Sequence, residues 1–115
     1  MSVPDFEALT LPLLSSLAGG NVLPMGEVRN KLSAHFELND VESTSDLFHR
    51  NINEATRHLM AADLIESLAG GYSITPLGRQ VLLRRLNFID TSFLKRLPGY
   101  EENIFGNSGS EDFDQ

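Results

Sequence analysis

The amino-acid sequence predicts a mainly α-helical fold with one small β-hairpin. Three observations support this expectation. Apolar residues over positions 48–62 recur at spacings of four and three, which is the period of one helix face. The pair Gly70-Gly71 separates two short apolar segments, as in a tight hairpin. Thr75-Pro76 combines a capping hydroxyl with a proline at the first position of a helix.

The size and composition fit one small intracellular domain. The chain has 115 residues, and 41% of them are hydrophobic, so a compact core is expected rather than wholesale disorder. The absence of cysteine excludes disulfides and thiolate metal sites and suits a reducing cytosol. Neither a secretory signal nor an apolar stretch of about 20 residues able to span a bilayer is present. We expect a soluble, cytoplasmic protein.

The formal net charge is −7 and is unevenly distributed. Residues 1–86 hold seven Lys and Arg against ten Asp and Glu, whereas residues 87–115 hold two against six. The C-terminal part thus carries over half of the excess negative charge. A mildly acidic folded part is not the basic footprint of a strong, nonspecific nucleic-acid binder.

Helical spacing of apolar residues over 5–18 predicts a first helix, which Pro12 complicates. An interior proline costs about 3 kcal/mol. Either the helix kinks there, or it begins near Thr10 with Pro12 in its first turn. Gly19-Gly20 ends it, and residues 21–23 could form one bridging strand.

Pro24 opens a second helix. Its apolar stripe consists of Met25, Val28 and Leu32, with Phe36 near its end. Residues 37–44 are mainly polar and predict a loop. Either Thr44 or Ser45 can cap the third helix.

The third helix is the best-defined element. Its apolar residues lie within about 40° of one line along the helix. They are Phe48, Ile52, Ala55, Leu59 and Ala62. Arg50, Asn53 and Arg57 project from the opposite side, with Glu54 at its edge. This helix is therefore expected to bury one face and to present the other.

The strands of the hairpin are expected over 64–68 and 72–74, with the glycine pair supplying positive φ angles. The fourth helix then begins at Pro76, and residues 89–97 form one further short helix. The apolar side of the fourth helix contains Leu77, Val81, Leu82 and Leu86. From about residue 101, Gly, Ser, Asn and acidic residues predict disorder. We thus expect a domain over 1–100 and a flexible acidic tail over 101–115.

These elements fit together in one architecture. The helices cannot bury their apolar stripes on one another without a cover, and a two-stranded ribbon alone is marginal in water. The order of helix, short strand, helix, helix, hairpin and helix is that of a winged helix-turn-helix. The third helix would be the recognition helix, and the hairpin would be the wing.

Several segments resemble those of one known family. They are Val3-Pro4-Asp5-Phe6 through Leu13-Leu14, the helix from Phe48 to Leu59, Ala62-Asp63-Leu64-Ile65-Glu66, Tyr72-Ser73-Ile74-Thr75-Pro76-Leu77-Gly78-Arg79 and Phe93-Leu94-Lys95-Arg96-Leu97-Pro98-Gly99-Tyr100. Over residues 3–102 the chain resembles the N-terminal winged-helix domain of Mrr-type restriction endonucleases, enzymes that act on modified DNA. Asn51, Asn53 and Glu54 stand where that family commonly has two basic residues and a tryptophan. The resemblance implies binding to double-stranded DNA, modified or unmodified, with the nuclease in a separate downstream domain.

The winged-helix placement gives a set of DNA-binding candidates. They are Arg50, Asn51, Asn53, Arg57 and His58 for the major groove, and Gly70, Gly71, Tyr72 and Ser73 for the wing. Arginine can contact phosphates or guanine, and asparagine can contact adenine. The alternative is a solvated helix face, in which Glu54 pairs with the arginines, while His58 and Tyr72 border the core.

No catalytic or metal-binding motif is apparent. Nucleases of the resembling family use an acid-x-Lys arrangement to hold a cation. Here Arg29 and Phe93 occupy the acid position before the two lysines, Lys31 and Lys95. The histidines, His35, His49 and His58, show no paired metal-ligand spacing. We expect no cofactor, no metal and no catalysis by this chain.

The acidic balance and a wing without Lys or Arg favour a second interpretation, a protein-interaction or dimerisation module without DNA binding. The fourth helix and the C-terminal helix, with Ile89, Phe93, Leu94 and Leu97, would offer the apolar surface for a homodimer. The basic cluster of Arg84-Arg85 and Lys95-Arg96 could meet phosphate, an acidic partner or the chain's own acidic tail, which would then regulate binding.

Overall fold

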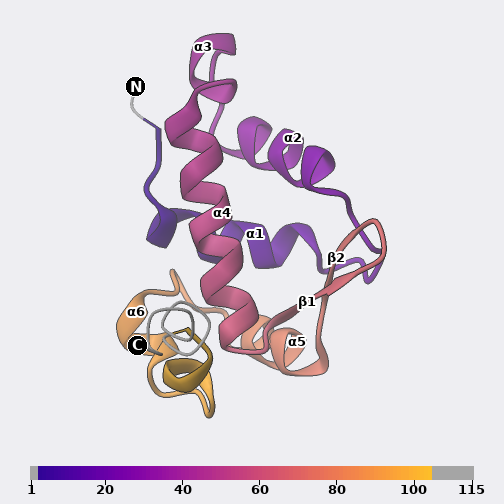
Figure 1. Cartoon of the computed structure of the whole chain (residues 1–115), viewed down its shortest axis with the longest axis vertical. Coiled ribbons are helices and arrows are strands. Elements are labelled where there is room, and N and C mark those ends of the chain that lie inside the picture. The colour runs from indigo at the N-terminus through magenta and orange to yellow at the C-terminus, as the bar shows by residue number, and fades with distance from the viewer. Residues whose placement is uncertain (1–2, 105–115) are drawn as a thin grey trace, which may run out of the picture.

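A computed structural model describes residues 3–104, in which helices α1 to α6 and a short helical segment at residues 100–104 accompany one two-stranded antiparallel sheet (Figure 1). In chain order the elements are α1 (Phe6–Ser16), α2 (Met25–His35), α3 (Asp40–Ser43), α4 (Asp46–Ala61), β1 (Ile65–Leu68), β2 (Gly71–Ile74), α5 (Pro76–Leu83) and α6 (Thr91–Leu94). This mostly helical arrangement with one hairpin confirms the winged-helix class. Within the described residues, every helix is too short or too polar to cross a membrane.

Helix α4 runs through the middle of the molecule and packs against α1 (Figure 1). The Ser45 hydroxyl accepts a hydrogen bond from the Phe48 amide at 3.2 Å and so caps the first turn. All five residues of the predicted apolar stripe are fully buried. Burying one large apolar side chain contributes about 1.5–3 kcal/mol, so this stripe anchors the helix.

Helix α1 continues through Pro12 and begins at Phe6, where the Asp5 carboxylate accepts from the Ala8 amide at 2.9 Å. The predicted alternative start near Thr10 is therefore wrong. Pro12 has no N–H to donate to the Ala8 carbonyl, at a cost of about 3 kcal/mol. Complete burial of the neighbouring leucines offsets that cost. They are Leu9, Leu13 and Leu14.

The predicted loop over 37–44 contains the short helix α3, which corrects the sequence-based expectation. Its N-terminus is a capping box: the Asn39 side chain accepts from the Glu42 amide at 2.8 Å, and the Glu42 carboxylate accepts from the Asn39 amide at 3.0 Å. This reciprocal pair satisfies two backbone donors, which allows a single turn of helix in a polar segment.

The hairpin pairs Ile65 with Ile74 and Leu68 with Gly71, so Ala69 and Gly70 form its turn. The expectation that both glycines supply positive φ is wrong, because only Gly70 does, at 90°. At Gly71 a Cβ would lie 2.2 Å from the Leu23 carbonyl oxygen. Leu23 exchanges two backbone hydrogen bonds of 2.9 Å with Tyr72, which confirms the predicted bridging strand as a single bridge.

Helix α5 begins as predicted, with the Thr75 hydroxyl accepting from the Gly78 amide at 3.0 Å, but it ends at Leu83. The later short helix covers only Thr91–Leu94 of the predicted 89–97. Residues 100–104 form a further helical segment, and Ile104 is 4% exposed, so the ordered chain extends beyond the predicted boundary at 100. The remainder of the predicted acidic tail lies outside the described residues.

The apolar surface predicted for a homodimer is largely part of the protein's own core. Ile89 and Leu94 are completely buried, and Phe93 and Leu97 are half-buried against the core. The buried Thr10 hydroxyl donates to the Ile89 carbonyl at 2.5 Å, which ties this segment to α1. The C-terminal elements therefore complete the core of the domain.

Candidate nucleic-acid interface

The outer face of α4, defined here as Arg50, Asn53 and Arg57, lies opposite the buried stripe. Arg50 and Asn53 are exposed, and 41% of the Arg57 side-chain surface is accessible. Within residues 3–104, no acidic side chain lies at ion-pair distance from Arg50. The structure thus places these three predicted residues together on one accessible side of α4.

Glu54 binds Arg57 at the edge of this face. A nitrogen of the Arg57 guanidinium lies 2.7 Å from Glu54 Oε2, and its Nε lies 3.4 Å from Oε1. The hydrogen bond from Arg57, together with that from His58, holds the pKa of the Glu54 carboxyl below its usual value despite partial burial. The acid therefore neutralises one of the two arginines of the outer face.

His58 points inward instead of joining the outer face. It is 8% exposed, and its ring stacks on Phe6 with centroids 4.5 Å apart. Nδ1 lies 2.5 Å from the Tyr100 hydroxyl, and Nε2 lies 3.0 Å from Glu54 Oε2. One neutral tautomer satisfies both bonds, with the phenol donating to Nδ1 and Nε2–H donating to the carboxylate. His58 is therefore not available on the outer face as a DNA contact. It borders the core, which is the alternative position predicted from the sequence.

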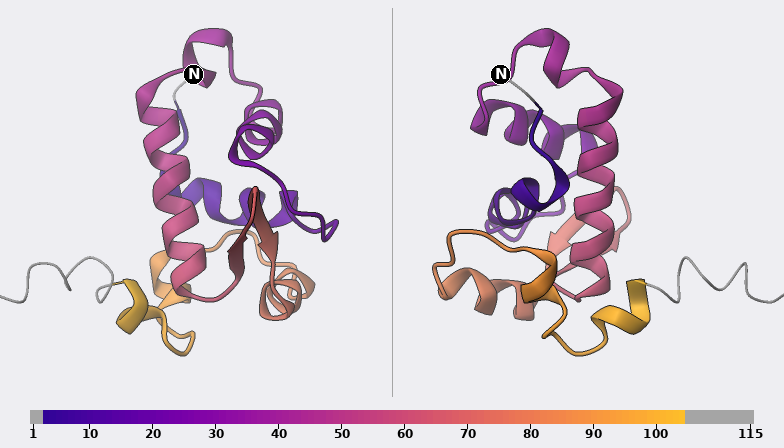
Figure 2. Two further views of the ribbon diagram at one scale, coloured as in Figure 1. Left: turned by 45° about the vertical axis from the view of Figure 1, so that its right-hand side comes forward. Right: turned by 90° about the vertical axis from the view of Figure 1, so that its left-hand side faces the viewer.

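Both ends of the described chain lie along α4 (Figure 2). The Asn51 amide donates to the Pro4 carbonyl at 2.9 Å, so this predicted DNA contact instead binds the N-terminal segment. The Asn103 amide donates to the Ala61 carbonyl at 2.9 Å, and Arg57 donates to the Ile104 carbonyl at 3.5 Å. These partners are more than forty positions apart in the sequence, and no local pattern indicates them.

The wing presents a different edge from the one predicted. Ser73 is buried, Tyr72 is half-buried, and Gly71 packs against Leu23, so of the four predicted wing residues only Gly70 is exposed. The exposed edge belongs to β1. Its accessible residues are Glu66, Ser67 and Leu68. The wing therefore adds an acid and an apolar tip beside α4, and no positive charge.

The predicted basic cluster lies at the ends of α5 and α6. Arg84, Arg85, Lys95 and Arg96 are all exposed. The Arg84 guanidinium carbon lies 5.8 Å from the centroid of the Phe93 ring, a cation–π distance that joins the two helices. Within residues 3–104, no group of three His, Asp or Glu side chains is arranged to hold a metal ion.

The protein-family comparison points to the same elements. A family model described as the Mrr N-terminal domain matches residues 6–84, a range that runs from the start of α1 through α4 and the hairpin to the C-cap of α5. No curated protein and no solved structure matches the chain. The family match covers most of the chain and confirms the resemblance predicted from the sequence. The chain therefore belongs to the Mrr N-terminal domain family.

Proposed function

We propose that this chain binds double-stranded DNA through the outer face of α4, with the hairpin as a flanking wing. The observation that carries this proposal is the division of α4 into a fully buried apolar stripe and an accessible polar face. Winged-helix proteins place the equivalent helix in the major groove. Membership of a family named for the N-terminal domain of Mrr supports a targeting role in a restriction system.

The spacing of the outer face suits groove binding. Arg50 and Arg57 are seven residues apart, which is two helical turns or about 10 Å along the axis. Asn53 lies between them on the same side. An arginine can bind guanine or a phosphate, and an asparagine can form two hydrogen bonds with adenine. The three side chains therefore provide both positioning contacts and a means of reading one or two base pairs.

The charges around α4 favour weak binding. Residues 3–104 hold nine Lys and Arg against thirteen Asp and Glu, a net charge of −4. Glu54 is bound to Arg57, and Glu66 lies on the wing. With about two to four phosphate contacts, the logarithm of the affinity should fall with the logarithm of salt with a slope of about −2 to −4.

The test is a titration of labelled duplex, with and without modified cytosine or adenine, at about 50 mM salt. Arg50→Ala and Arg57→Ala should each weaken binding about tenfold, because each removes a contact of the outer face. Arg96→Ala is the matched control, since it removes the same charge from an exposed site outside α4. Absence of binding at tens of micromolar protein, or an equal loss with Arg96→Ala, would contradict the proposal.

The proposed role is recognition without catalysis. The family match is to a domain described as N-terminal, and the sequence lacks the acid-x-Lys arrangement of the family's nuclease. Incubating the protein with plasmid DNA and Mg²⁺ is the direct check. Cleavage that persists after further purification would overturn this part of the proposal.

A further inference from the structure

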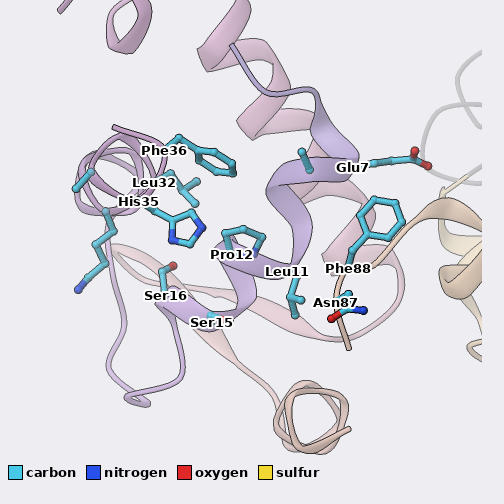
Figure 3. Close-up of a pocket in the computed structure, with 13 residues that line it drawn as sticks. Glu7, Leu11, Pro12, Ser15, Ser16, Leu32, His35, Phe36, Asn87 and Phe88 are labelled. Atoms are coloured by element: carbon cyan, nitrogen blue, oxygen red, sulfur yellow. The ribbon is translucent and has the colours of Figure 1, made fainter. Parts of the chain in front are cut away.

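An apolar groove runs along the side of α1 opposite its buried stripe (Figure 3). Its volume is about 730 Å³. Leu11 and Pro12 form its floor. The C-terminal end of α2, with His35 and Phe36, borders one side, and the loop carrying Phe88 borders the other. The groove is thus built from three separate parts of the chain.

The rim of the groove exposes an aromatic ring. Phe88 is 52% exposed, and it lies in the segment after α5, directly before the completely buried Ile89. Burying an apolar side chain of this size contributes about 1.5–3 kcal/mol. Because the described residues leave half of Phe88 exposed, much of this stabilisation is not gained in the monomer. An exposed ring beside an apolar recess is typical of a surface that a partner covers.

Charge is distributed across the groove in a self-complementary way. Glu7 lies on the same side as Phe88, whereas Lys31 and His35 belong to α2 on the other side (Figure 3). The Glu7 carboxylate accepts from the Thr91 amide at 3.0 Å and from its hydroxyl at 2.7 Å, so the negative charge is fixed at the rim. A two-fold rotation about the centre of the groove exchanges the two sides.

We propose that this groove is a self-association surface whose occupant is a second copy of the chain, related by a two-fold axis. In that arrangement Glu7 of each copy faces Lys31 of the other, and each Phe88 covers the Phe36 side of the opposite groove. A two-fold interface uses the same patch on both copies, and an acid on one side with a base on the other satisfies this requirement. A partner that carried only one sign of charge would be repelled either by Glu7 or by Lys31.

The surface is independent of the proposed DNA-binding face. None of the residues that line the groove belongs to α4 or to the hairpin, so both outer faces would stay uncovered in the dimer. An interface made of one groove and its rim is expected to bury less than the roughly 800 Å² per partner of a stable interface, so we expect a weak, concentration-dependent dimer. Self-association through the groove and DNA binding through α4 can therefore be tested independently.

The experiment is sedimentation or light scattering of the full chain from about 1 μM to about 1 mM protein. The wild type should shift from monomer to dimer within this range. Phe88→Asp should weaken the dimer at least about tenfold, because it buries a charge opposite an apolar wall. Val41→Asp is the matched control, since Val41 is 78% exposed on α3 and does not line the groove.

Lys31→Glu provides a second variant, which should weaken the dimer through repulsion by Glu7 and reduce its dependence on salt. Unchanged thermal melting of each variant monomer separates an interface effect from a folding defect. A wild type that stays monomeric throughout, a dimer indifferent to Phe88→Asp, or an equal loss with Val41→Asp would each overturn the proposal. DNA titration of Phe88→Asp at low protein concentration reports separately on the outer face of α4.

Discussion

The hydroxyl of Tyr100 lies 2.5 Å from Nδ1 of His58, so the segment after α6 is hydrogen-bonded directly to α4. The same imidazole contacts Glu54, and Glu54 binds Arg57 on the outer face. A continuous chain of polar contacts thus connects the C-terminal segment with the candidate interface. Changes at one end of this chain are expected to alter the other.

Replacing Glu54 with Gln should strengthen DNA binding roughly two- to fivefold, in line with the roughly 0.5–1 kcal/mol of an exposed ion pair. The change removes the negative charge that neutralises Arg57, while the amide oxygen still accepts from Nε2–H of His58. Fluorescence anisotropy with a labelled duplex measures the affinity. Glu66→Gln removes the same charge from the wing, and an equal gain there would show that only the net charge matters.

Replacing Tyr100 with Phe should lower the free energy of unfolding by about 1–3 kcal/mol, because the buried Nδ1 of His58 loses its donor. Urea denaturation measures this difference. Tyr72→Phe is the control, since within residues 3–104 the Tyr72 hydroxyl makes no hydrogen bond. Equal losses in the two variants would exclude a specific role for the Tyr100–His58 bond.

The alkaline limb of stability should also depend on Tyr100. Burial raises the pKa of this phenol above its ordinary value of 10.0. A group with a raised pKa in the folded state contributes stability that is full below pH 10 and is lost as pH rises through the folded pKa. Tyr100→Phe should therefore flatten the stability profile above that pH, and an unchanged profile would contradict the assignment.

Glu54 should govern part of the acid limb. Because its pKa is lowered from 4.5, its contribution is fully present above pH 4.5 and is lost as pH falls through the lower, folded pKa. Stability measured by urea denaturation across this window should decline less steeply for Glu54→Gln than for the wild type. Parallel profiles would show that other carboxylates account for acid unfolding.

Gly71→Ala should destabilise the protein by about 1–3 kcal/mol, the usual range for overpacking. The new Cβ would lie 2.2 Å from the Leu23 carbonyl oxygen and would force the bridging strand away from β2. Gly19→Ala is the control, because its Cβ would meet no atom within 4 Å and its φ is not positive. Thermal melting that fails to separate the two variants would refute this account of the bridge.

The sequence predicts those parts of the fold that depend on local signals. The stripe of α4, the cap at Thr75 and the hairpin all follow from residues within a few positions of one another, and all are present. The short helix α3 could also have been predicted from the sequence, because Asn39 and Glu42 have the spacing of a capping box. A polar composition masked that signal.

The candidate site was less predictable because its environment depends on distant segments. Arg50, Asn53 and Arg57 follow from helical periodicity and lie together on α4. His58 and Asn51 are directed inward or sideways by Tyr100 and Pro4, which only the folded chain brings close. Ile104 is similarly hidden, since one buried aliphatic residue in an acidic, glycine-rich segment gives no periodic pattern.

The placement of Pro4 beside Asn51 and of Ile104 beside Arg57 has a practical consequence for handling the protein. An affinity tag, a fluorophore or a fused partner joined directly before residue 3 or directly after residue 104 would start next to the same helix. Bulky additions there would compete for space with an incoming duplex and lower its apparent affinity. Labels for binding assays are better introduced at a single engineered cysteine elsewhere, which a cysteine-free chain permits.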